Sequence, residues 1–165
     1  MAGHRLPLDG TFYRMKALSD ANDVLGPARA PEGRFHRDGQ RALYLSVTPE
    51  GCRIATARYT TATTPPRAIF PLRVIGATVV DLRDPAATDA LGIDTTHRAI
   101  EWQPLRARGL PSPTWDIADR VRALGLDGML YASRSQPDLT HLTLFRWNEP
   151  GTHATVTRTD SPLPS

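Results

Sequence analysis

An apolar stretch, "RAIFPLRVIGATVVDL", runs from Arg67 to Leu82 and is rich in β-branched residues. Such side chains favour extended backbone, because they pack well on a pleated surface. Pro71 and Gly76 interrupt the run, and both residue types weaken the interior of a strand. The stretch therefore predicts one strand, or two strands separated at these residues, and hence a fold built on a β-sheet.

Other segments have the composition of shorter strands, and turn-forming residues separate them. These segments are Thr11–Lys16, Ala42–Val47, Gly128–Ser133 and His141–Trp147. The residues from 19 to 33 are rich in Asp, Asn, Gly and Pro and are expected to form a loop. Residues 148–165 are polar, and we expect them to fray.

Helix signals occur between these strands. Thr48 is a suitable N-cap with Pro49 at the first helical position, which predicts a helix to about Tyr59. A short helix is expected at Pro85–Leu91, before a glycine. The clearest helix begins at Ser112, and its apolar stripe consists of Ile117, Val121 and Leu124. The expected fold is α+β: a mixed, mostly antiparallel β core with a few flanking helices.

The chain of 165 residues contains no repeat or long linker, so we expect a single domain, residues 1–165, with its core at about residues 11–147. The first ten residues contain no apolar region, so no secretory signal is expected. No apolar run approaches the length of a membrane span, and a single cysteine, Cys52, fits a reducing cytoplasm. We therefore expect a cytoplasmic protein without a membrane partner.

Of the 20 basic residues, 19 are arginines and one, Lys16, is a lysine. A GC-rich genome would explain this preference, although individual arginines can still bind phosphate groups through two hydrogen bonds at once. The basic residues are interspersed with acidic ones, so no nucleic-acid-binding stripe is indicated. The five histidines are isolated in the sequence, and Cys52 has bulky neighbours on its helix. No metal site is therefore expected, and Cys52 is interpreted as a small buried residue rather than a nucleophile.

Arginine, aromatic and hydroxyl residues recur together along the expected strands: Tyr13–Arg14, Arg34–Phe35–His36, Tyr44 and Ser133–Arg134. Guanidinium groups bind diphosphate, aromatic rings stack on bases, and hydroxyls hold ribose. Each of these residues also has an ordinary structural interpretation, as a surface arginine, a core tyrosine or a turn serine. From the residues alone, the pattern indicates a nucleotide-binding α+β domain.

The order of five segments resembles the RES domain family. These segments are "FYRM", "EGRFHRDGQRALYLSVTPEG", "VVDLRDPAATDALGI", "SPTWDIADRVRALGLDGMLYASRS" and "LTLFRW", which together cover roughly Thr11–Trp147. The resemblance implies a fold related to the ADP-ribosyltransferases. It also implies the activity of the toxins in Xre–RES toxin–antitoxin pairs, which degrade NAD.

The resemblance also implies site residues. The family's arginine corresponds to Arg14, its serine to Ser133 and its strand tyrosine to Tyr44. Its Gly-Arg-aromatic-Asn element corresponds to Gly33, Arg34 and Phe35, with His36 where asparagine is usual. The implied catalytic residues are Arg14, Arg34, Tyr44 and Ser133. The implied binding residues are Tyr13, Arg14, Gly33, Arg34, Phe35, His36, Tyr44, Arg58, Ser133 and Arg134.

The family's glutamate is missing from its expected place. It lies on the helix after the tyrosine strand, and counting from Tyr44 places Ala55 at its position. A carboxylate at that point would stabilise the positive charge that develops on ribose when nicotinamide leaves. Among the four glutamates, Glu50 is interpreted as a charge in the first turn of its helix. Glu101, beside Trp102, is a candidate substitute for the missing acid.

The resemblance therefore implies an NAD phosphorylase or NAD glycohydrolase. In such an enzyme, Arg14 and Arg34 hold the diphosphate or an incoming phosphate, Tyr44 stacks near the nicotinamide, and Ser133 binds ribose or the carboxamide. NAD would be the substrate, with inorganic phosphate as an optional co-substrate and no required cofactor. The alternatives are a protein ADP-ribosyltransferase and, because of Ala55, a non-catalytic module that binds NAD or ADP-ribose. The implied partner is a helix-turn-helix antitoxin of Xre type, and a homodimer is left open.

Overall fold

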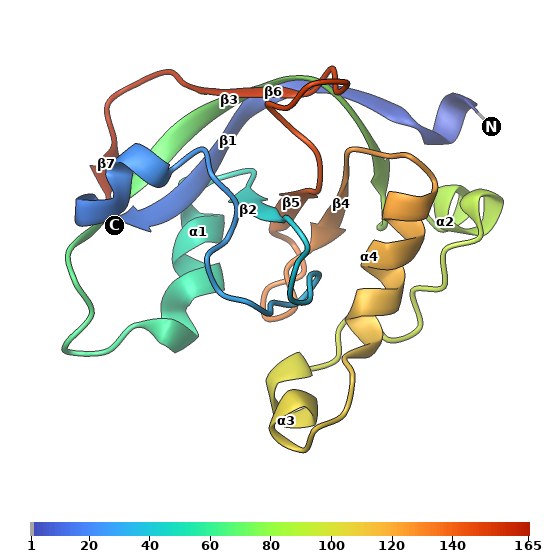
Figure 1. The fold of residues 1–165 in the computed structure, drawn as a ribbon, viewed down its shortest axis with the longest axis horizontal. Coiled ribbons are helices and arrows are strands. Elements are labelled where there is room, and N and C mark those ends of the chain that lie inside the picture. Colours follow the sequence, from blue (N-terminus) through green and yellow to red (C-terminus); the bar gives the residue numbers. More distant parts are fainter. Residues whose placement is uncertain (1) are drawn as a thin grey trace.

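The computed structural model describes residues 2–165, and its strands form one sheet (Figure 1). The strands are β1 (Leu6–Ala17), β2 (Leu43–Ser46), β3 (Arg67–Asp81), β4 (Gly128–Ala132), β5 (Thr140–Leu144), β6 (Thr155–Arg158) and β7 (Leu163–Pro164). Their order is β1-β2-β5-β4-β3-β6, and β1 also pairs with β3, so five strands close into a ring. The pairing of β3 with β4 is parallel, and every other pairing between these strands is antiparallel. The predicted α+β class with a mostly antiparallel core is confirmed.

Strand β3 is continuous through both residues that could have divided it. Pro71 pairs with Tyr13 of β1, and on the other edge it lies between the residues that pair with β6 and those that pair with β7. Its missing N–H group therefore leaves no strand partner unsatisfied on that edge. Gly76 has a positive φ of 73°, and its N–H donates to the Asp9 carboxylate at an irregularity in the β1–β3 register. Glycine adopts this backbone conformation without strain.

The α-helices are α1 (Pro49–Thr56), α2 (Pro85–Leu91), α3 (Trp102–Ala107) and α4 (Pro113–Ala123). Short 3-10 helices lie at η1 (Ala2–His4), η2 (Leu18–Asp23) and η3 (Ala57–Tyr59). The Thr48 hydroxyl accepts a hydrogen bond from the Gly51 N–H at 3.1 Å, which confirms the predicted cap of α1. Ser112 caps α4 in the same way. Helix α3 was not predicted, and η2 lies in the segment that we expected to be a loop.

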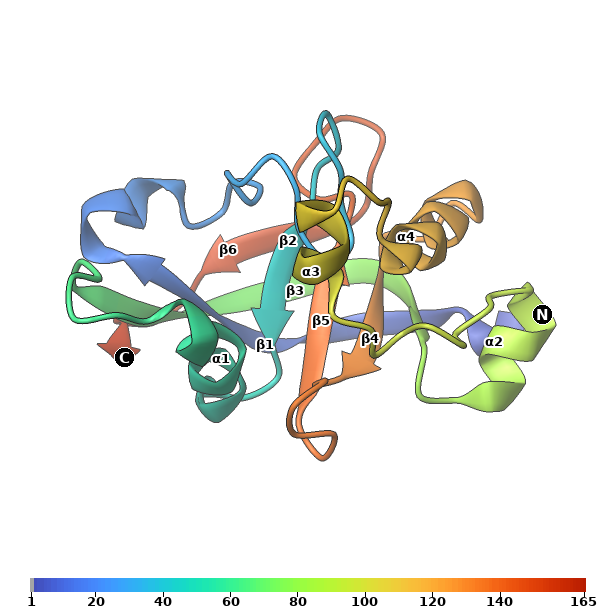
Figure 2. The same cartoon turned by 90° about the horizontal axis from the view of Figure 1, so that it is seen from below.

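The helices flank the short strands (Figure 2). In the two views, α1 lies on one side of β2, β5 and β4, α4 lies on the other side, and α3 lies below them. The predicted stripe of α4 is directed inward, with Ile117 and Val121 buried and Leu124 packed against the same apolar cluster. A second apolar cluster fills the space between the long strands β1 and β3 and the short strands β2 and β5, and Ala154 and Val156 of the C-terminal segment belong to it. Among the described residues, no helix is both long and apolar enough to cross a membrane.

The expectation that the chain frays after Asn148 is wrong for residues 154–158. These residues contain β6, which pairs with β3, and Ala154 and Val156 are fully buried. The Asn148 side chain fixes this return, because its amide donates to the Val156 carbonyl and accepts from the Val156 N–H, both at 2.9 Å. A polar segment can therefore complete a sheet when two small apolar residues reach the core.

Candidate functional site

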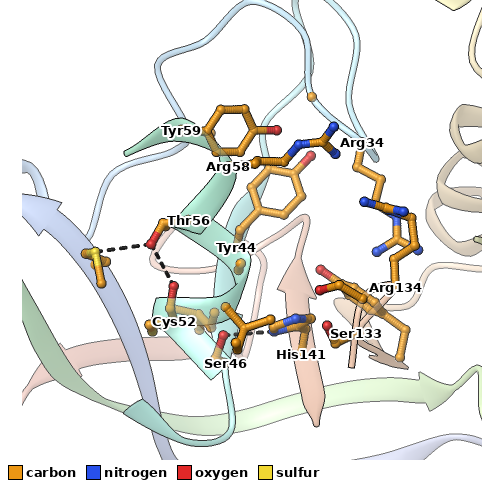
Figure 3. Close-up of a pocket in the computed structure, with 18 of the residues that line it drawn as sticks. Arg34, Tyr44, Ser46, Cys52, Thr56, Arg58, Tyr59, Ser133, Arg134 and His141 are labelled. Atoms are coloured by element: carbon orange, nitrogen blue, oxygen red, sulfur yellow. Dashed lines mark hydrogen bonds between the residues drawn. The ribbon is translucent and has the colours of Figure 1, made fainter. Parts of the chain in front are cut away.

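A cavity of about 480 Å³ lies between α1 and α3, over the short strands (Figure 3). Its walls come from β1, β2, β4 and β5, from the loop before β2, from α1 and η3, and from the residues that precede α3. In Figure 3, Arg34, Ser133 and Arg134 lie on one side, the residues of α1 and η3 lie on the other, and Tyr44, Ser46 and His141 lie between them. Segments that are distant in sequence therefore converge here.

Helix α1 forms one wall, and Ala55 is part of it. Ala55 occupies the position at which the family resemblance implies a glutamate, and this position faces the cavity. The neighbouring Thr56 hydroxyl donates to the Cys52 carbonyl at 2.8 Å, so this hydroxyl is bound to the backbone of its own helix. Cys52 is buried, and burial raises the pKa of its thiol to about 11. The thiol is protonated at neutral pH, which agrees with its interpretation as a buried residue rather than a nucleophile.

Arg14 lies on the wall but is also an anchor for the chain. Its Nη1 donates to the carbonyls of Val24 at 2.6 Å and Gly26 at 2.7 Å, so it holds the segment that follows η2. Burial lowers its pKa to about 10, which still leaves it charged at neutral pH. One guanidinium nitrogen of Arg14 is thus committed to the protein. Tyr13, its neighbour on β1, also lines the cavity.

The predicted Gly-Arg-aromatic-His element is built around Tyr44. The Tyr44 hydroxyl accepts from the Phe35 N–H at 3.0 Å and lies 2.7 Å from Nδ1 of His36. His36 Nε2 lies 2.8 Å from the Ala30 carbonyl, which can only accept, so Nε2 carries the proton and Nδ1 accepts from Tyr44. A Cβ atom on Gly33 would lie 2.5 Å from His36 Cε1 and 2.8 Å from the Tyr44 hydroxyl. Glycine is therefore required at position 33 for this packing.

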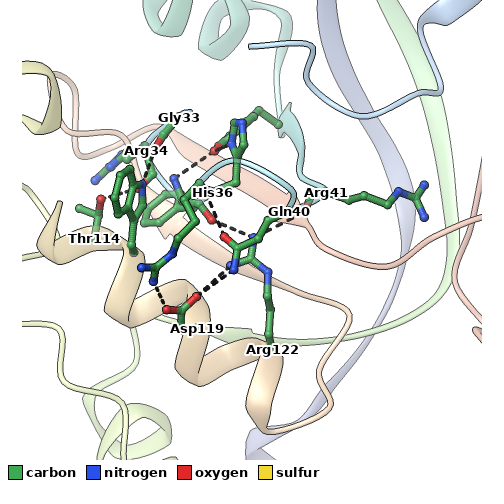
Figure 4. A network of polar contacts seen from close by, with 12 residues as sticks. Gly33, Arg34, His36, Gln40, Arg41, Thr114, Asp119 and Arg122 are labelled. Carbon is green, nitrogen blue, oxygen red and sulfur yellow. Dashed lines mark hydrogen bonds and ion pairs between the residues drawn. The ribbon is translucent and has the colours of Figure 1, made fainter. Parts of the chain in front are cut away.

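Helix α4 holds the same element from the other side (Figure 4). Trp115 Nε1 donates to the Gly33 carbonyl at 2.8 Å, and the Thr114 hydroxyl donates to the Arg34 carbonyl. Arg122 donates to the Phe35 carbonyl at 3.0 Å. These contacts fix the backbone from which the Arg34 side chain projects. Phe35 was implied as a binding residue, but it does not line this cavity. Its ring is buried against Tyr131 at a centroid distance of 4.9 Å.

Arg34 presents an unpaired donor. Its Nη2 donates to the Arg98 carbonyl, and its guanidinium lies 5.2 Å from the centre of the Tyr131 ring. Its Nε is buried and has no hydrogen-bond partner among residues 2–165. Burial lowers the pKa of Arg34, and the charge of Arg134 lowers it further. A buried donor without an acceptor is costly, and an anion bound between the two arginines would satisfy both the donor and the charge.

The end of β4 supplies two further predicted residues. Ser133 is buried, and its hydroxyl accepts from the Gln136 N–H at 3.3 Å. Arg134 Nη1 lies 3.2 Å from Oε1 of Glu101, and Arg58 Nη2 lies 3.9 Å from the same oxygen. Glu50 does not line the cavity, since it is exposed and pairs with Arg53 on α1. This placement agrees with its interpretation as a first-turn charge.

A pair of polar residues at the floor of the cavity was not predicted from the sequence. Ser46 of β2 and His141 of β5 pair across the sheet, with Oγ 2.8 Å from Nδ1. Burial lowers the pKa of His141 to about 4, so its imidazole is neutral at pH 7. The available signal was the strand alternation, because Ser46 lies two residues after Tyr44 and therefore on the same face. Trp102 was also not assigned to the site, although it lines the cavity.

The cavity carries an excess of positive charge. Its wall contains Arg14, Arg34, Arg58 and Arg134, whereas the carboxylates that line it are Glu32 and Glu101. Glu32 is already paired with Arg106, at 2.7 and 3.0 Å. Among the described residues, no group of three or more His, Cys, Asp or Glu side chains is arranged to hold a metal ion. The arrangement is suited to an anionic ligand with aromatic or sugar groups.

Comparisons with known proteins agree with this description. A family model described as the RES domain matches residues 4–164. A search of curated proteins found no match. The structure is similar to a chain in the crystal structure of the M. tuberculosis MbcT–MbcA toxin–antitoxin complex, with a TM-score of 0.65 and 18% sequence identity. That similarity covers 99% of this chain and 88% of the other, and at this identity it shows a shared fold.

Proposed function

Because the chain belongs to the RES domain family, we propose that it is an enzyme that binds NAD and cleaves the bond between nicotinamide and ribose. The observation that carries the proposal is the arginine-rich cavity, above all the buried Arg34 Nε that lacks an acceptor. A dinucleotide supplies what this cavity lacks, since its diphosphate provides acceptor oxygens and negative charge. Its rings and riboses suit the tyrosines and hydroxyls of the wall.

The arginines define where the diphosphate binds. Arg34 and Arg134 lie next to each other on one side of the cavity, and Arg58 extends from η3 (Figure 3). A diphosphate between them would accept the Arg34 Nε hydrogen bond and relieve the repulsion between Arg34 and Arg134. Arg14 contributes charge to the same region, although its Nη1 is held by backbone carbonyls. These contacts hold the nucleotide in one orientation, which is the first requirement for cleavage at one bond.

The chemistry is a substitution at C1′ of the nicotinamide ribose. When the C–N bond breaks, its electron pair stays on the ring nitrogen, so the cationic ring leaves as neutral nicotinamide and positive charge develops on the sugar. An oxygen of water or of inorganic phosphate then bonds to C1′, and water releases its extra proton to solvent. The products are nicotinamide with ADP-ribose, or nicotinamide with the 1″-phosphate of ADP-ribose.

The uncharged residues at the floor of the cavity are compatible with the positive charge that develops on the ribose. Ser46 and the uncharged His141 can hydrogen-bond the sugar or the carboxamide without adding positive charge beside the developing cation. We assign Ser133 the same kind of role at the edge of the cavity. Tyr44 presents its ring, because its hydroxyl is already used by Phe35 and His36. Its function in this scheme is to stack against the nicotinamide side.

As a physiological role, we propose a toxin that depletes NAD in the cytoplasm and is neutralised by a helix-turn-helix antitoxin of Xre type. The support is membership of the family together with the structural neighbour, which is described as part of a toxin–antitoxin complex. A non-catalytic NAD-binding module is the second candidate, because Ala55 occupies the position of the expected acid.

The proposal is tested by incubating the purified protein with NAD, with and without phosphate, and separating the products by chromatography. Release of nicotinamide is expected, and a phosphate-dependent second product would identify phosphorolysis. Intact NAD together with measurable NAD binding would support the binding module instead. Label from NAD retained on protein would indicate transfer to a protein acceptor.

A further inference from the structure

We propose that Glu101 is the carboxylate that stabilises the ribosyl cation in this protein, in place of an acid on α1. The inference rests on the proposed cleavage of NAD and identifies the residue that compensates for Ala55. It arises from where Glu101 lies and from what holds it.

Glu101 precedes the first residue of α3 and lines the cavity. Its Oε1 lies 3.2 Å from Arg134, beyond the end of β4, and 3.9 Å from Arg58, in η3. The two arginines belong to opposite walls, so the carboxylate lies between them. It is half exposed, which leaves it accessible to a ligand in the cavity.

The residues around Glu101 are tied to both walls. The Arg98 carbonyl accepts from Arg34, and Gln103 Nε2 donates to the Tyr59 hydroxyl. The segment that carries Glu101 is thereby connected to the loop before β2 on one side and to η3 on the other. A carboxylate held at both flanks can act at a defined point, which electrostatic catalysis requires.

The other carboxylates are less suitable. Of the two that line the cavity within residues 2–165, Glu32 makes two hydrogen bonds to Arg106 and is neutralised there. Glu50 lies outside the cavity and pairs with Arg53. Glu101 also pairs with arginines, but its partners, Arg58 and Arg134, line the cavity, so a bound diphosphate can take over their hydrogen bonds, whereas Arg106 lies outside the lining.

Ligand binding leaves the negative charge of Glu101 less neutralised by the neighbouring arginines. In the free protein, Arg58 and Arg134 share its negative charge. When a diphosphate takes the donors of these arginines, the carboxylate loses part of its pairing and lies beside the adjoining ribose. A carboxylate in a ligand-filled, water-poor cavity then stabilises positive charge on C1′ more strongly than solvent would.

The test compares Glu101→Gln with wild type and with the matched control Glu50→Gln. Replacing the carboxylate by an amide of the same shape should lower kcat for nicotinamide release by about 10²- to 10³-fold. The NAD dissociation constant should change by less than about 10-fold, and Glu50→Gln should behave as wild type. Thermal unfolding of Glu101→Gln verifies that the variant is folded. Adding Ala55→Glu to Glu101→Gln should restore turnover, because the wall of α1 faces the same cavity.

The outcomes separate this inference from the proposed function. An active wild type with an equally active Glu101→Gln would overturn the role of Glu101 and leave the proposed function standing. Tighter NAD binding by Glu101→Gln at unchanged kcat would also overturn it, since the carboxylate would then merely compete with the ligand for the arginines. A wild type that binds NAD and leaves it intact would overturn the proposed function and this inference with it.

Discussion

Ser46 and His141 face each other across strands β2 and β5 at the floor of the cavity, with the hydroxyl oxygen 2.8 Å from Nδ1 of the imidazole. Both side chains are buried, and the arrangement keeps the imidazole uncharged beside an arginine-rich wall. The pair therefore links the stability of the sheet to the electrostatics of the site.

This pair predicts that acid destabilises the protein through His141. Its pKa in the folded protein is about 4, below the ordinary value of 6.5. The unfolded chain therefore binds a proton more readily, and stability is lost as the pH falls from about 6.5 to about 4. The contribution is at most about 3 kcal/mol. Urea unfolding of wild type and His141→Gln across this range measures it. Equal slopes of stability against pH in the two proteins would contradict the assignment.

A second prediction concerns Gly33. A methyl group at this position would overlap His36 and the Tyr44 hydroxyl, so Gly33→Ala must displace one of them. We expect a loss of about 1–3 kcal/mol in the free energy of unfolding, together with weaker ligand binding. Gly3→Ala is the control, because no atom lies within 4 Å of the added methyl group there. Similar effects of the two substitutions on denaturant unfolding would disprove the packing argument.

A third prediction concerns the buried Nε donor of Arg34. Arg34→Lys keeps the charge but removes the Nε donor, so NAD should bind about 10- to 100-fold more weakly. Isothermal titration calorimetry gives the dissociation constants. Arg108→Lys, an exposed substitution away from the cavity, should leave the affinity unchanged. Retention of full affinity in Arg34→Lys would show that the buried donor does not contact the ligand.

The last prediction concerns the C-terminal residues. Ending the chain after Asn148 removes β6 and exposes the edge of β3, so we expect a loss of at least about 3 kcal/mol in stability. Ending it after Arg158 removes β7 and exposed residues, and we expect a cost below about 1 kcal/mol. Thermal melting of the two shortened proteins measures the difference. A stable, soluble protein ending at Asn148 would contradict the role assigned to β6.

The elements that were predicted are those with local signals. Thr48 with Pro49 and Ser112 with Pro113 identified the starts of α1 and α4, because capping depends on neighbouring residues. Helix α3 has no side-chain cap and six residues, and a tertiary ion pair between Arg106 and Glu32 holds it. Strand β6 likewise depends on its place beside β3. Neither dependence is visible in a local pattern.

The site was predictable to the extent that the family resemblance reached it. The resemblance implied three site residues that do lie on the cavity wall: Arg34, Tyr44 and Ser133. In the sequence His141 is an isolated histidine. Its contact with Ser46 depends on the register in which β2 pairs with β5. The anchoring of Arg14 by backbone carbonyls depends on the path of the chain after η2. Contacts of this kind arise from tertiary structure.

The closed ring of strands has a consequence for how the protein is made. Ser46 and His141 are separated by 95 positions in the chain, and β1 must pair with both β2 and β3 before the ring exists. Bringing such distant segments together is slow, because the entropy of closing long loops is lost before the contacts form. The walls of the cavity include residues from four of the five strands of this ring, β1, β2, β4 and β5. We therefore expect the ability to bind a ligand to appear in the last stage of folding, and a newly made chain to be inert until then.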